Sequence, residues 1–205
     1  MARHYSMIAA LALGTVVAAS SAAAQGTGTT STAAVDQGVT FGVGGGIAIP
    51  SGDMSSVVKT GFNVTGMLGF NPAMLPFGLR ADVSYNRFGF DSNKTGGVTG
   101  NSSLFGGALN GLFKLPAASI TPYVLAGPGF YHVSASADNG GGSTSENKFA
   151  VQGGAGIQAN LAGMTTHLEA KIVNIFTSGS SARFFPITVG IMFGGGLPTN
   201  SQSVK

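Results

Sequence analysis

Apolar residues alternate with polar or small residues over most of the chain, from residue 38 to residue 193. A period of two is typical of β-strands whose two faces meet different surroundings. In one clear stretch, for example, Arg80 and Asp82 flank Ala81. The pattern predicts eight strands, at residues 38–49, 59–70, 77–88, 103–114, 120–132, 147–160, 164–176 and 183–193.

The connections between these strands alternate in length. Two of them, 89–102 and 133–146, are long and rich in Gly, Ser and Asn, whereas every second connection is short. Barrels of the outer membrane combine long extracellular loops, short periplasmic turns and an even number of strands. Each predicted strand also has about the 9–11 residues needed to cross a bilayer at a tilt. We therefore predict an all-β fold, an eight-stranded antiparallel up-and-down transmembrane β-barrel over residues 38–193.

Aromatic residues and charges fall on opposite faces of the predicted strands. Most Phe and Tyr residues share the apolar face and lie near strand ends, as in the aromatic girdles at membrane interfaces. Charged residues share the polar face, except Arg87 and Arg183 beside the long connections. This polarity favours a lipid-facing exterior over a soluble lipid-binding barrel, which would carry its charges outside. The predicted girdles comprise Phe70, Phe77, Phe113, Tyr123 and Phe193 beside the short turns, and Phe62, Tyr85, Tyr131, Phe149 and Phe176 toward the long loops.

Six charged or titratable side chains are predicted to point into the barrel. An unpaired charge in a narrow lumen is costly, so we expect Glu169 to pair with Arg80 or Lys114. Asn63, Asn110, Gln152 and Gln158 could complete a hydrogen-bonded network that plugs the lumen. The alternative is a charged constriction in a narrow, porin-like channel for small solutes. The predicted interior set is Arg80, Asp82, Lys114, His167, Glu169 and Lys171.

Catalytic and metal chemistry find little support in the sequence. His167 and Glu169 could form part of a catalytic dyad, but no recognisable motif ties a serine to His167. His132 and His167 have no partners at metal-ligand spacing, and the chain has no cysteine. We expect neither enzymatic activity nor a cofactor.

Composition and the two ends of the chain give evidence about partners and cellular location. Only 8% of residues are charged, the net charge is +3 and no run of Lys or Arg occurs, which disfavours nucleic acid as a partner. Residues 1–24 combine a short basic start, an apolar stretch and small residues, the pattern of a cleaved secretory signal peptide. Residues 25–37 are predicted to be a flexible leader, and residues 194–205 a C-terminal tail.

Three stretches resemble strands of the small eight-stranded outer-membrane β-barrel family, which includes OmpA/OmpX-type and opacity-type surface barrels. Residues 122–131 look like its fifth strand, 167–171 like its seventh and 185–193 like its closing strand. The resemblance implies a non-enzymatic protein in the outer membrane of a Gram-negative-type envelope, in contact with lipid. We expect a monomer with a structural or surface-interaction role, in which loops 89–102 and 133–146 meet a surface ligand or protein.

Overall fold

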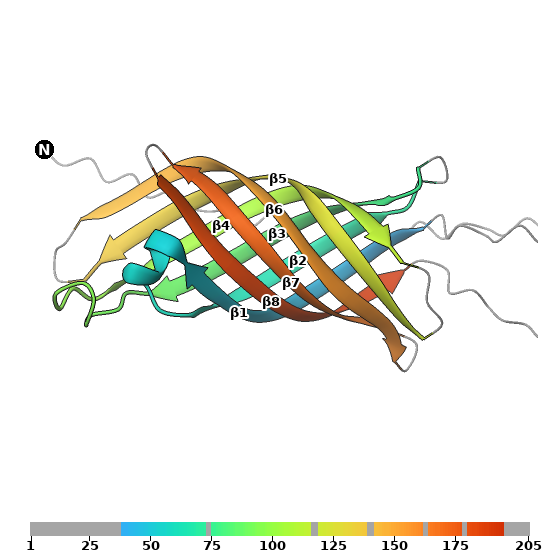
Figure 1. The fold of residues 1–205 in the computed structure, drawn as a ribbon, viewed down its shortest axis with the longest axis horizontal. Coiled ribbons are helices and arrows are strands. Elements are labelled where there is room, and N and C mark those ends of the chain that lie inside the picture. The colour runs from blue at the N-terminus through green and yellow to red at the C-terminus, as the bar shows by residue number, and fades with distance from the viewer. Residues whose placement is uncertain are drawn as a thin grey trace, which may run out of the picture. The chain divides into compact units, whose positions relative to one another are not determined.

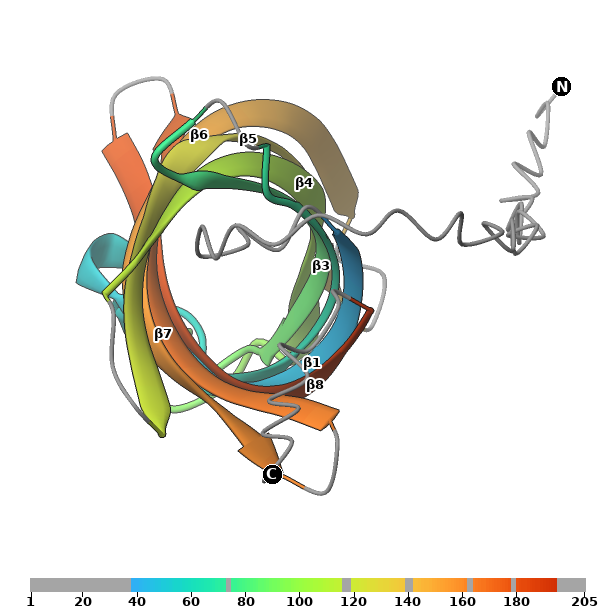
Figure 2. The ribbon, with the colours of Figure 1, turned by 90° about the vertical axis from the view of Figure 1, so that its right-hand side faces the viewer.

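The computed structural model describes residues 38–72, 75–115, 119–138, 142–161, 164–177 and 180–194. Its eight antiparallel strands each pair with their neighbours in sequence, and β1 pairs with β8 to close the barrel (Figures 1 and 2). The predicted fold class is confirmed, with one 3-10 helix, η1 (Gly52–Ser56), after the first strand. The strands are β1 (Val39–Ser51), β2 (Gly61–Phe70), β3 (Gly78–Gly89), β4 (Gly100–Lys114), β5 (Ile120–Ala137), β6 (Ser143–Leu161), β7 (Met164–Thr177) and β8 (Ser180–Gly194).

The proposed signal peptide and leader lie outside the described residues, as does the tail after Gly194. No helix in the described part of the chain is both long and apolar enough to span a membrane.

The two connections predicted to be long loops are shorter than expected. β5 and β6 continue as a paired hairpin to Ser136 and Ser143, so most of segment 133–146 is strand. Ser, Thr and Gly made this segment look like a loop, but residues in a growing hairpin gain ladder hydrogen bonds whatever their propensity. In segment 89–102, β4 already begins at Gly100, and the remaining turn is held by the Asp91 carbonyl oxygen, which accepts from the Lys94 and Thr95 amides.

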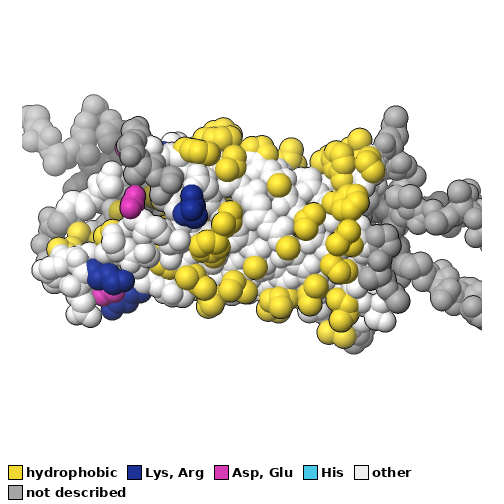
Figure 3. Space-filling view, viewed as in Figure 1, with side chains coloured by type: hydrophobic (Ala, Val, Ile, Leu, Met, Phe, Trp, Pro, Cys, Tyr) yellow, Lys and Arg dark blue, Asp and Glu magenta, His cyan; other side chains and the backbone are white. Residues whose placement is uncertain are grey.

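The outer wall of the barrel is apolar. Val43, Val64, Val83, Leu109 and Val189 are each more than half exposed, on five different strands. Figure 3 shows apolar side chains spread along the wall of one face, whereas the visible charged side chains gather toward the end that carries η1. Closure of the sheet pairs the backbone groups that would otherwise form an open edge in the bilayer.

Two residues of the predicted girdles face the opposite way. Tyr123 and Tyr131 point into the lumen and are only 2% and 4% exposed. Both faces of β5 are small or apolar, so alternation alone did not define which face is inside. Phe130, which is 67% exposed, takes the outward place expected of Tyr131. The other eight predicted girdle residues are exposed or half-buried: Phe70, Phe77, Phe113, Phe193, Phe62, Tyr85, Phe149 and Phe176.

A row of aromatic rings crosses three strands on the outer wall. Phe130 of β5 contacts Phe149 of β6 edge to face, with ring centroids 5.4 Å apart. Phe149 in turn stacks on Phe176 of β7 at 5.8 Å. Such contacts add to the burial energy of each ring. Phe149 and Phe176 are two of the residues predicted to form the aromatic girdle toward the long loops, and that girdle stays a prediction.

Candidate functional site in the barrel lumen

A buried ionic cluster bridges the lumen between β3 and β7. Arg80 on β3 donates from Nε to Asp82 Oδ1 at 2.8 Å and from Nη2 to Asp82 Oδ2 at 3.1 Å. The same guanidinium donates from Nη1 and Nη2 to the Glu169 oxygens at 2.7 and 2.8 Å. Since β3 and β7 are not neighbours in the sheet, the contact between Arg80 and Glu169 crosses the barrel.

Lys171 of β7 completes the cluster. Its Nζ lies 3.1 Å from Asp82 Oδ2 and 3.3 Å from Glu169 Oε1. Two cations therefore meet two carboxylates, and all four side chains are nearly inaccessible to solvent. Buried charges are tolerated when they are paired and hydrogen-bonded in this way. The cluster is electrically balanced.

Neutral side chains from three further strands extend the cluster. Asn110 Nδ2 donates to Asp82 Oδ2 at 3.0 Å, and Gln152 Nε2 donates to Asn110 Oδ1 at 2.8 Å. The Tyr131 hydroxyl then donates to Gln152 Oε1 at 3.2 Å. On the other side, the Tyr123 hydroxyl donates to Glu169 Oε2 at 2.8 Å. One hydrogen-bonded network thus joins β3, β4, β5, β6 and β7.

The two tyrosines are the members that sequence reasoning missed. Each lies directly across the strand pair from a glycine, Tyr123 from Gly156 and Tyr131 from Gly106. A Cβ at either glycine would come within 2.5 Å of the tyrosine side chain. A bulky residue in register with a glycine is a signal that could have indicated an inward orientation.

Two of the six predicted interior residues, Lys114 and His167, lie outside the ionic cluster described above. Lys114 is exposed at the end of β4, and the predicted pairing of Glu169 is with Arg80. Lys114 is the last residue of its strand, beyond the level of the cluster. His167 is buried against Gly190, but neither ring nitrogen has a hydrogen-bond partner among the described residues. His167 and Glu169 therefore do not form a hydrogen-bonded dyad.

No group of three or more His, Asp or Glu side chains in the described part of the chain is arranged to hold a metal ion.

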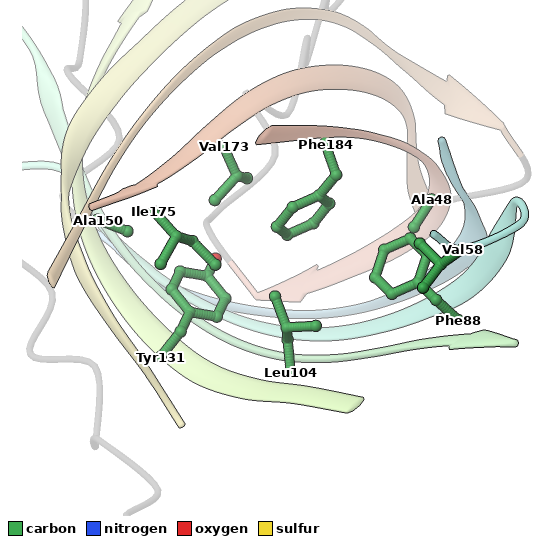
Figure 4. Close-up of a cluster of buried hydrophobic side chains, with 9 residues drawn as sticks. All are labelled: Ala48, Val58, Phe88, Leu104, Tyr131, Ala150, Val173, Ile175 and Phe184. Atoms are coloured by element: carbon green, nitrogen blue, oxygen red, sulfur yellow. The ribbon is translucent and has the colours of Figure 1, made fainter. Parts of the chain in front are cut away.

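An apolar layer fills the lumen next to the ionic cluster, toward the long-loop end. Phe88 and Phe184 pack edge to face with ring centroids 5.7 Å apart, and Tyr131 packs against Phe184 at 6.4 Å. Tyr131 belongs to both the apolar layer and the hydrogen-bonded network, because its ring lies in the layer and its hydroxyl donates to Gln152. Figure 4 shows these side chains converging on the lumen. The layer comprises Ala48, Val58, Phe88, Leu104, Tyr131, Ala150, Val173, Ile175 and Phe184.

Solved structures with the same fold are barrels of the outer membrane. The Neisserial surface protein A (NspA) superposes with a TM-score of 0.56 at 14% identity, covering 76% of this chain and 96% of that one. A major outer membrane protein from Thermus thermophilus superposes with a TM-score of 0.55 at 13% identity, covering 76% and 98%. At these identities the likeness shows the fold alone. No curated protein matches the sequence.

The sequence itself matches a described family over residues 9–193. This match includes all eight strands except the last residue of β8. Together with the closed barrel and its apolar wall, it places the protein in the outer membrane. The chain belongs to the outer membrane protein beta-barrel domain family.

Proposed function

We propose that this protein is a non-enzymatic barrel whose lumen is closed to solutes and which serves as a rigid support for an extracellular surface. The observation that carries the proposal is the bridge from Arg80 to Glu169 across the lumen. In an eight-stranded barrel the interior is just wide enough for side chains to fill it. A charge-balanced cluster at this point leaves no unpaired ionic group to attract or guide a permeant ion.

The apolar layer provides a second obstruction. Phe88, Phe184 and Leu104 are at most 1% exposed, although their side chains point into the lumen. A hydrated solute would have to pass these aromatic and aliphatic groups before it reached the ionic cluster, and losing its water there is unfavourable. Together, the ionic cluster and the apolar layer favour a plugged lumen over the alternative of a narrow channel.

The surface role rests on the end of the barrel that carries η1, segment 90–99 and the β5–β6 hairpin. Figure 1 shows these elements together at one end. Long connections of such barrels are extracellular, and binding residues are commonly carried on loops held by a rigid scaffold. A surface ligand or protein would accordingly meet the barrel at this end.

Planar bilayer recording tests the closed lumen. We expect the full-length protein, purified from outer membranes, to give no discrete openings under conditions in which a general porin does. The variant Arg80→Ala/Glu169→Ala/Phe88→Ala/Phe184→Ala removes the bridge with the charge balance kept and also opens the apolar layer, and should show measurable conductance. The matched control Lys59→Ala/Asp91→Asn removes an ion pair between residues outside the strands, of which Lys59 is 54% exposed, and should remain silent. Steady openings of the unaltered protein would overturn the proposal in favour of the channel.

A further inference from the structure

A half-open cavity of about 440 Å³ lies in the lumen at the long-loop end, above the apolar layer. Five strands, η1 and the residues after β3 contribute to its walls. Its volume is within the ~300–1,000 Å³ range of small-molecule sites. The aliphatic part of the lining includes Met54, Val58, Leu104, Val133, Ile175 and Ala182.

The polar groups of this cavity come mainly from β6. Glu146 and Lys148 both line it and form an ion pair with each other. The Lys148 side chain is 20% exposed and that of Glu146 is 60% exposed, so the pair remains in contact with water. Leu104 and Ile175, in contrast, are almost completely buried. The site therefore offers an apolar recess and, separately, a solvated ionic group.

The floor of the cavity is closed. Leu104, Ile175 and Val58 belong both to the cavity wall and to the apolar layer that contains Phe184 and Tyr131. Beyond Tyr131, hydrogen bonds run through Gln152 and Asn110 to the ionic cluster. A molecule that enters from the long-loop end is thus retained rather than passed through the barrel.

We propose that this cavity binds the aliphatic chain of a free single-chain amphiphile, with the polar head at Lys148 and Glu146. An aliphatic chain matches the lining and has no polar group to leave unpaired, whereas a peptide backbone in the recess would lose hydrogen bonds to water. Burial of the aliphatic chain removes apolar surface of both the ligand and the cavity wall from water. The inference deepens the proposed surface role and rests on the closed lumen.

Methyl NMR of the full-length protein in lipid nanodiscs tests the proposal, because detergent tails would themselves compete for the cavity. Titration with decanol or decanoate should give saturable shifts of the Leu104, Ile175 and Val58 methyl groups. The outward-facing methyls of Val64 and Leu109 should change only in proportion to the amphiphile dissolved in the bilayer. The protein contains no Trp, so intrinsic Trp fluorescence offers no simpler readout.

Cavity-filling variants provide the matched comparison. Ala135→Phe and Thr144→Phe, on β5 and β6, each place a ring in the cavity and should weaken binding at least tenfold. Ala126→Phe adds the same ring to the exposed outer wall of β5 and should leave binding unchanged. Circular dichroism and the heat-dependent gel shift of a folded barrel show whether each variant has folded. The use of two filling variants keeps the test decisive if one fails to fold.

Three results would overturn the inference: shifts that do not saturate, equal binding by filled and unfilled variants, or cavity methyls already in contact with nanodisc lipid chains that added amphiphile does not displace. Failure of the closed lumen is a separate result. It would appear as conductance of the unaltered protein in the bilayer recording, whether or not an amphiphile is present.

Discussion

Arg80 and Glu169 meet through two hydrogen bonds of 2.7 and 2.8 Å although 89 positions separate them in the chain. The same guanidinium also binds Asp82, so one side chain of β3 satisfies two carboxylates. Arg is suited to this role because its planar fork presents several donors in fixed directions. Five strands are joined through the groups attached to this pair.

Replacement of Arg80 by Ala should strongly destabilise the barrel. Asp82 and Glu169 would share Lys171 as their cationic partner among the described residues, and an uncompensated buried charge costs about 3–5 kcal/mol. Reversible urea unfolding in lipid vesicles, followed by circular dichroism, measures the loss. Arg87→Ala on the exposed face of the same strand is the control, and should change the unfolding free energy by less than about 0.5 kcal/mol. Equal effects of the two variants would show that the network does not stabilise the fold.

Tyr123→Phe should have a smaller, defined effect. The variant removes the hydroxyl that donates to Glu169 Oε2 at 2.8 Å but keeps the ring opposite Gly156. A hydrogen bond to a charged group contributes about 1.5–3 kcal/mol. Tyr85→Phe, on a ring that packs beside Phe62 on the outer wall, is the matched control. An unfolding free energy unchanged by Tyr123→Phe would contradict the assignment of its hydroxyl to the network.

Gly46→Ala and Gly66→Ala should differ although they make the same chemical change. A Cβ at Gly46 would lie 1.9 Å from the Ile187 carbonyl oxygen of β8, whereas a Cβ at Gly66 meets nothing within 4 Å. Overpacking of this kind costs about 1–3 kcal/mol, and here it falls on the β1–β8 closure. The yield of folded barrel on gels after refolding, together with urea midpoints, compares the two variants. Equal midpoints would be inconsistent with a close approach of β1 to β8.

Val83→Arg tests the orientation of the wall. Val83 is 53% exposed in the middle of β3, between the inward-facing Asp82 and Ser84. A cation facing lipid near the bilayer midplane costs about 2–4 kcal/mol. Val98→Arg, in the turn between β3 and β4, introduces the same charge where water is available and should have little effect. A stable Val83→Arg barrel in vesicles would place this face outside the hydrocarbon region.

The strands and their faces could be predicted from sequence because a period of two is a local property. Residues such as Arg80, Asp82, Glu169 and Lys171 share the polar parity of their strands, which was enough to place them in the lumen. Where both faces of a strand are apolar, as around Tyr123 and Tyr131, the local pattern did not show which face points into the lumen. Ring size and the glycine opposite each tyrosine, on β6 and β4, decided the orientation.

The sequence by itself determined that eight amphipathic strands would form a barrel with an apolar exterior, since only closure satisfies both the pattern and the backbone hydrogen bonds in a bilayer. The tertiary structure alone decided which interior groups meet. Strand register and tilt bring Arg80 to the level of Glu169, leave Lys114 at the barrel end, and gather Phe88, Phe184 and Ile175 beneath a cavity. These contacts join residues on strands that are distant in sequence, and their geometry exists only once the barrel has closed.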